Sequence, residues 1–169
     1  SSDLINLEEY DNWLMVRQYR HALDRAVACL AARAHSKHEI EQKLLRVGYR
    51  PCTVEMVLYK LEREHLLNDA DFARQWVEAR SGRKLGRSRI AQELRRKGID
   101  ADEAEEALSA IGEDAQLADA IALAEKTAAR AKSDEDPRKT YQRIAAMLAR
   151  RGFRWDITKE ALAQVLQAD

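Results

Sequence analysis

Basic side chains are concentrated in residues 80–98, and this stretch carries the clearest sign of chemistry. The chain has 169 residues with 29 basic and 29 acidic side chains, yet the stretch holds eight basic residues and one acid, Glu93. Gly82 and Gly86 predict a flexible connection into a helix, and a basic loop at a helix start suits contacts with phosphate. The predicted contact residues are Arg80, Arg83, Lys84, Arg87, Arg89, Arg95, Arg96 and Lys97.

A second, smaller basic set lies near the end of the chain. Arg150, Arg151 and Arg154 precede Trp155, which falls outside the apolar repeat described below and is of a type that stacks on nucleic-acid bases. These four residues are secondary candidates for the same contact. Acidic residues dominate residues 99–116 instead, and a solvated helix surface is the alternative explanation for the basic stretch.

Patterns typical of catalysis or metal binding are missing from the sequence. Residues 81–88 contain two glycines but lack the order of a phosphate-binding loop. His35 and His38 lie near Cys29, but a metal site needs further ligands at close spacing. The two cysteines make neither a disulfide framework nor a zinc pattern, which favours a reduced, cytoplasmic setting. We therefore predict no enzymatic activity, no cofactor and no metal.

Apolar residues follow a helical period along almost the whole chain. Leu23, Val27 and Leu30 show the spacing of three or four residues that marks one helix face. Six glycines and two prolines leave little room for a turn-rich β fold. No apolar run approaches the length of about eighteen residues expected of a membrane helix. The sequence predicts an all-α protein without a membrane segment.

A pattern of six positions occurs three times. From Ile40, apolar residues follow at offsets of four, nine, eighteen and twenty-one, with a glycine at eight. The pattern starts again at Ile90 and at Ile144. The glycines can take the left-handed conformation that ends a helix, and the later apolar residues belong to another helix. The glycines are Gly48, Gly98 and Gly152.

One further amphipathic helix precedes each of these helix pairs, which predicts three tandem three-helix repeats. The predicted segments are an extra helix or arm at 1–21 and repeats at 22–67, 68–111 and 112–169. Ser36 with Glu39 is a capping-box pattern, and Asn68, Asp100 and Asp136 are typical helix caps. Stacked repeats of this kind form an elongated body, straight or curved, that offers long interaction surfaces.

Each glycine turn resembles the turn of a helix-turn-helix motif, whose second helix reads DNA bases. In the second repeat that helix is acidic and has no basic residue, so phosphate would repel it. Its acids are Asp102, Glu103, Glu105 and Glu106. We therefore expect non-specific contact with nucleic acid, or a protein partner of complementary charge.

The chain resembles the RecX family of bacterial proteins that regulate the RecA recombinase. The matching stretches are Arg33–Ile40, Leu66–Ala73, Arg89–Ile99 and Leu148–Phe153. The resemblance extends over about residues 20–166 and implies three tandem three-helix repeats. It also implies a cytoplasmic protein without catalytic activity, and we expect a monomer.

The same resemblance implies a partner and an activity. It implies binding in the groove of the RecA–DNA filament and inhibition of ATP hydrolysis, strand exchange and co-protease activity, within homologous recombination, DNA repair and the SOS response. The family pattern does not identify the residues that contact RecA. The basic stretch is predicted to meet single- or double-stranded DNA without sequence preference, or an acidic RecA surface. The alternative is a stand-alone, non-specific DNA-binding helical repeat protein.

Overall fold

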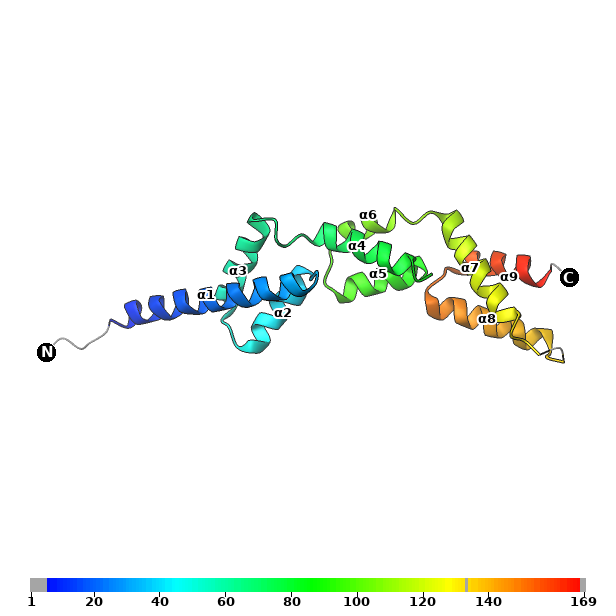
Figure 1. Ribbon diagram of the computed structural model, residues 1–169, viewed down its shortest axis with the longest axis horizontal. Helices are drawn as coiled ribbons and strands as arrows, with labels where there is room; N and C mark the ends of the chain where they lie inside the picture. The colour runs from blue at the N-terminus through cyan, green and yellow to red at the C-terminus, as the bar shows by residue number, and fades with distance from the viewer. Residues whose placement is uncertain (1–5, 133, 168–169) are drawn as a thin grey trace. The chain divides into compact units, whose positions relative to one another are not determined.

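The computed structural model describes residues 6–132 and 134–167, and every regular element in these ranges is an α-helix (Figure 1). Residues 1–5 of the predicted N-terminal segment, and residues 133, 168 and 169 of the predicted third repeat, lie outside them. The helices are α1 (Leu7–Ala32), α2 (Lys37–Val47), α3 (Pro51–Arg63), α4 (Asp69–Ser81), α5 (Arg87–Arg96), α6 (Ala101–Leu108), α7 (Glu113–Ala128), α8 (Pro137–Arg151) and α9 (Trp155–Leu166). In the ranges described, no helix is both long and apolar enough to cross a bilayer.

Contacts divide the chain into two compact units. Of the described residues, the first contains 6–72 together with 97–99, and the second contains 73–96, 100–132 and 134–167. In the first unit α1 packs on α2 and α3, and α2 packs on α3. In the second unit α5 packs on α6, while α7, α8 and α9 pack on one another.

The N-terminal segment does not form a separate helix. Helix α1 runs without interruption from Leu7 to Ala32, through the point where the first repeat was predicted to begin. Its sequence contains neither glycine nor proline, so nothing in the backbone ends the helix earlier. Its second half supplies Ala22 and Ala26 to the core, whereas Leu7, Trp13 and Val16 in its first half are exposed.

The apolar positions of the repeat form the cores of both units. Each repeat buries an isoleucine and two leucines almost completely, and burial of such a side chain contributes about 1.5–3 kcal/mol. The buried residues are Ile40, Leu44 and Leu58 in the first unit and Ile90, Leu94, Leu108, Ile144, Leu148 and Leu162 in the second. The prediction of a repeated core is therefore confirmed.

Helix ends follow the predicted capping residues. Ser36 and Glu39 form a complete capping box at α2, and Asp136 caps α8 with proline in the first turn. Asp100 caps α6 by accepting a hydrogen bond from the Asp102 N–H at 2.9 Å. The three repeat glycines all have positive φ: Gly48 (+102°), Gly98 (+72°) and Gly152 (+88°).

Within each unit, a group at or just before the start of a helix donates a hydrogen bond to a backbone carbonyl that is distant in sequence. In the first unit the Ser36 hydroxyl donates to the Lys97 carbonyl at 2.6 Å. In the second unit the Gly86 N–H donates to the Arg151 carbonyl at 2.8 Å. A Cβ on Gly86 would lie 2.2 Å from the carbonyl carbon of Gly152, so only glycine allows this approach. The joint places the end of α8 beside the start of α5.

Candidate anion-binding groove

A groove in the second unit is lined by five arginines that come from distant parts of the chain. Its volume is about 670 Å³. The lining residues are Arg80, Arg83, Leu85, Arg89, Glu93, Met147, Arg150 and Arg151. The structure thus brings three residues of the main basic set together with two of the secondary set. We call this surface the arginine groove.

The loop between α4 and α5 holds part of the arginine groove in place. The sequence predicted a flexible connection here, but the structure shows a closely hydrogen-bonded turn. The N–H groups of Lys84 and Leu85 donate to the carbonyls of Ser81 and Arg80, at 2.8 and 3.3 Å. The buried Gln116 side chain accepts a hydrogen bond from the Arg87 N–H at 2.9 Å and thereby ties the turn to α7.

Glu93 organises the α4 and α5 side of the groove. Its carboxylate accepts a hydrogen bond from Trp76 Nε1 at 3.0 Å and pairs with Arg80 Nε at 2.8 Å and Arg89 Nε at 3.4 Å. The Arg80 guanidinium also lies over the Trp76 ring, 4.3 Å from its centroid, in a cation–π contact. Glu93 therefore orients two cations of the groove and neutralises part of their charge.

Arg151 has a positioning role on the opposite side. Its Nη1 donates to the carbonyl oxygens of Arg83 and Lys84, at 3.1 and 3.4 Å, and so holds the turn against the end of α8. Arg83 and Arg150 are exposed, and neither has an acidic partner among residues 6–132 and 134–167. These two side chains are the cations most available to a ligand.

The charges of the arginine groove indicate which kind of ligand would complement it. Five guanidinium groups face one carboxylate, which leaves a concentrated positive charge. Guanidinium binds phosphate oxygens in pairs and always stays charged. A chain of regularly spaced phosphates, such as a nucleic-acid backbone, would contact several of these groups together. Within the described part of the chain, no cluster of His, Cys, Asp or Glu could hold a metal ion.

The remaining main candidates lie outside the groove, and three are paired with acids. Lys84 pairs with Asp119 at 2.8 Å, and Arg87 pairs with Glu105. In the first unit Lys97 pairs with Glu39 at 2.7 Å. Locally the sequence shows one opposing acid, but the fold supplies three more from other helices. Arg95 and Arg96 are exposed on α5 and do not line the groove.

The last two secondary candidates also lie outside the groove lining. Arg154 contacts Asp156 at 2.7 Å and Glu113 at 3.8 Å. Trp155 is 62% exposed, as its place outside the apolar repeat suggested.

Sequence reasoning missed the positioning roles of Glu93 and Trp76. Trp76 is only partly buried and presents its ring to Arg80. The spacing of four residues between Trp76 and Arg80, and between Arg89 and Glu93, is a signal that such side chains meet on a helix. The contact of Trp76 with Glu93 joins two helices and has no local signal.

A helical repeat fold with a cationic groove defines a broad class of helical repeat proteins. Comparison with known families shows to which family of this class the chain belongs. Three family descriptions match in order: RecX, first three-helix domain, residues 22–61; second, 68–108; and third, 114–162. The chain belongs to the RecX family. The repeats predicted from the glycine pattern are thus confirmed as three-helix domains.

Relatives and solved structures agree with this assignment. Regulatory protein RecX of Prosthecochloris aestuarii is 36% identical over 148 residues, which cover 87% of this chain and 95% of that protein. Regulatory protein RecX of Mycobacteroides abscessus is 38% identical over 141 residues, 79% of this chain and 68% of that protein. The crystal structure of RecX from Lactobacillus salivarius matches with a TM-score of 0.82 at 25% identity, over 90% of this chain and 99% of that one.

Proposed function

We propose that this protein regulates the RecA recombinase by binding the RecA–DNA filament, with the arginine groove against the DNA backbone. Bound there, it inhibits ATP hydrolysis, strand exchange and co-protease activity. It acts as a cytoplasmic monomer and catalyses no reaction itself. The observation that carries the proposal is the convergence of Arg80, Arg83 and Arg89 with Arg150 and Arg151 around one groove.

The charge distribution supports contact with the backbone rather than with the bases. Helix α6 follows the glycine turn and would be the reading helix of a helix-turn-helix motif. It carries four acids, one of which pairs with Arg87, and no basic residue. An acidic helix is repelled by phosphate, so recognition by the arginine groove would not depend on DNA sequence.

The test is RecA ATP hydrolysis on single-stranded DNA, titrated with three versions of this protein. The first is the wild type. The second carries Arg83→Gln and Arg150→Gln, which remove the two unpaired cations of the groove. The third carries Arg95→Gln and Arg96→Gln, which remove the same charge from exposed positions outside the groove. All four side chains are exposed, so we expect the fold to be retained.

The proposal predicts inhibition by the wild type and by the Arg95/Arg96 variant, and weaker inhibition by the Arg83/Arg150 variant. A wild-type protein without effect on ATP hydrolysis would contradict the regulatory role. Equal inhibition by all three versions would show that the arginine groove does not contribute to inhibition. Equal affinity for DNA with and without RecA would favour the stand-alone DNA-binding alternative.

A further inference from the structure

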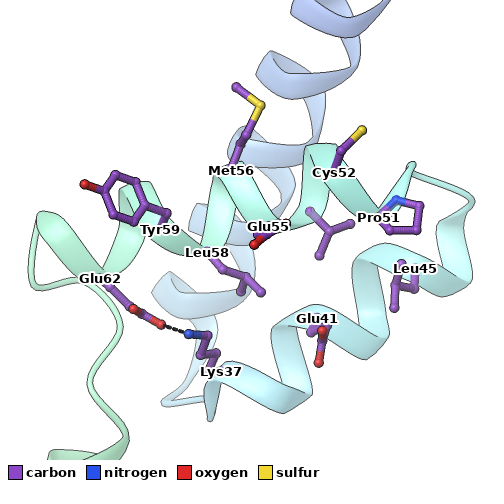
Figure 2. Close-up of a pocket in the computed structure, with 11 residues that line it drawn as sticks. Lys37, Glu41, Leu45, Pro51, Cys52, Glu55, Met56, Leu58, Tyr59 and Glu62 are labelled. Carbon is purple, nitrogen blue, oxygen red and sulfur yellow. Dashed lines mark ion pairs between the residues drawn. The ribbon is translucent and has the colours of Figure 1, made fainter.

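The first unit has a second groove, between α2 and α3, with a different character (Figure 2). Its volume is about 700 Å³. Leu45 on α2 and the buried Val54 and Leu58 on α3 form its apolar base. The other lining residues are Lys37, Glu41, Pro51, Cys52, Glu55, Met56, Tyr59 and Glu62. We call it the α2–α3 groove.

Exposed apolar side chains run along α3 at this groove. Cys52, Met56 and Tyr59 are spaced by four and three residues, so they lie on one face of the helix. Met56 is 47% exposed and Tyr59 is 61% exposed. Helix α1 packs on α3 as well, but it lies behind α2 and α3 in the view of Figure 2. The stripe therefore remains on the surface of the first unit, next to a recess that can receive further apolar side chains.

The charges around the α2–α3 groove are mainly negative. Glu41, Glu55 and Glu62 line it, against one base, Lys37. Lys37 pairs with Glu62 across one end of the groove, as the dashed line in Figure 2 shows. Glu41 lies 3.6 Å from His38 Nδ1, and Glu55 has no ion-pair partner among the described residues. Arg63 lies over the Tyr59 ring at 5.9 Å, outside the groove lining.

We propose that the α2–α3 groove binds an amphipathic helix of a partner protein that carries lysines or arginines beside its apolar face. Apolar side chains spaced by three and four residues would pack on Leu45, Met56 and Tyr59, as in other helix-in-groove complexes. Basic side chains on the flanks would lie near Glu41 and Glu55 and complement their charge. The same acids repel phosphate, so this groove does not suit nucleic acid. The inference is independent of the arginine groove.

Two labelled synthetic peptides test the inference by fluorescence anisotropy with the full chain. Each is about sixteen residues long, sufficient for a helix to form, with leucines spaced by three and four. One peptide has lysine at its polar positions and the other has glutamate. We expect the lysine peptide to bind at least about tenfold more tightly than the glutamate peptide. Equal affinity, or preference for the glutamate peptide, would overturn the proposal.

Paired variants locate the binding. Met56→Ser with Tyr59→Ser should weaken lysine-peptide binding about tenfold, since two apolar contacts are lost. Val27→Ser with Val47→Ser, at exposed positions outside the groove, should leave it unchanged. Glu55→Lys should shift preference toward the glutamate peptide, whereas Asp24→Lys on α1 should not. If the control variant of either pair changed peptide binding as much as the groove variant does, the peptide would not bind in the α2–α3 groove.

The wild-type protein offers a measurement that needs no substitution. Cys52 is exposed in the α2–α3 groove, whereas Cys29 is half-buried and packs against the core. Bound lysine peptide should slow the reaction of Cys52 with a thiol reagent at least severalfold and leave the rate at Cys29 unchanged. An unaltered Cys52 rate at saturating peptide would place the peptide elsewhere and overturn the proposal.

Discussion

Glycine after the second helix of each repeat is required for more than one physical reason. At Gly48 an added Cβ would meet open space, so only the strain of the left-handed backbone opposes a side chain. At Gly152 an added Cβ would also lie 2.3 Å from the Cβ of Arg89, in the joint between α8 and α5. The two positions therefore separate backbone strain from close packing.

Alanine at these two positions should destabilise the protein to different degrees. We expect Gly48→Ala to lower the free energy of unfolding by about 1 kcal/mol, which is the cost of left-handed backbone for a residue with a Cβ. Gly152→Ala should lower the free energy of unfolding clearly more than Gly48→Ala does, because the start of α5 must also move. Urea unfolding of both variants measures the difference, and equal losses would contradict the packing role of Gly152.

Glu39 makes the first unit sensitive to acid. Burial raises the pKa of its carboxyl, but hydrogen bonds from Lys97, Arg33 and the Ser36 N–H outweigh burial and lower this pKa from 4.5 to about 2. A carboxyl whose pKa is lower in the folded than in the unfolded protein stabilises the fold. This stabilisation is complete at pH values above the unfolded pKa, and it is lost as the pH falls through the folded pKa. Burial of Asp69 raises its own pKa and acts in the opposite direction.

Glu39→Gln should therefore lower the free energy of unfolding at pH 7 by about 3 kcal/mol. It should also flatten the loss of stability between pH 4.5 and 2. The measurement is urea unfolding at several pH values, with Glu55→Gln as a control at an exposed position. A Glu39→Gln variant with the wild-type pH dependence would show that this carboxylate does not contribute.

The caps of α2 and α8 have similar local chemistry but different surroundings. Ser36 is fully buried, accepts a hydrogen bond from the Glu39 N–H at 3.2 Å, and donates to the Lys97 carbonyl at 2.6 Å. Asp136 is exposed and accepts from the Arg138 N–H at 2.9 Å. The first cap therefore holds a tertiary joint, whereas the second serves its own helix.

Removing these caps should separate the two effects. Asp136→Ala should lower the free energy of unfolding by about 1 kcal/mol, which is typical of a lost helix cap. Ser36→Ala should cost about 2 kcal/mol or more, because the Lys97 carbonyl also loses its hydrogen-bond donor. Guanidinium unfolding compares the variants. A smaller loss for Ser36→Ala than for Asp136→Ala would contradict the tertiary role of this hydroxyl.

The helices could be predicted because their determinants are close together in sequence. Ile40 and Leu44 lie one turn apart, Gly48 ends the same helix, and Ser36 caps its start, so a window of about four turns specifies α2. The same local pattern at Ile90 and Ile144 identifies the other repeats. The length of α1 was missed because no residue marks a boundary near 21, and an apolar segment without a breaker can continue a helix.

The arginine groove could be predicted only in part. Arg80, Arg83 and Arg89 are close in sequence and stand out as a basic stretch, but Arg151 lies 68 residues beyond the Arg83 carbonyl that it contacts. Their meeting depends on the close approach of Gly86 and Gly152, which requires knowledge of how two helices dock. The acids that pair with Lys84, Arg87 and Lys97 likewise come from distant helices, so the local charge count overstated the positive charge.

The two units carry grooves of opposite charge, the arginine groove in the second and the α2–α3 groove in the first. Among the described residues none lines both grooves, so substitutions in one should leave the other unaffected. Arg83→Gln with Arg150→Gln should retain lysine-peptide binding, and Met56→Ser with Tyr59→Ser should retain DNA binding. Fluorescence anisotropy measures both. If either pair of substitutions weakened binding of the lysine peptide and of DNA equally, the two surfaces could not act independently.

The salt dependence of binding to RecA-coated single-stranded DNA tests the central claim, that the arginine groove contacts phosphate, most directly. For each lost phosphate contact the log–log slope falls by about one. We expect Arg83→Gln with Arg150→Gln to reduce the slope by about two relative to the wild type. We expect Arg95→Gln with Arg96→Gln to leave it unchanged. An unchanged slope in the first variant, or an equal reduction in both, would contradict binding of the DNA backbone in this groove.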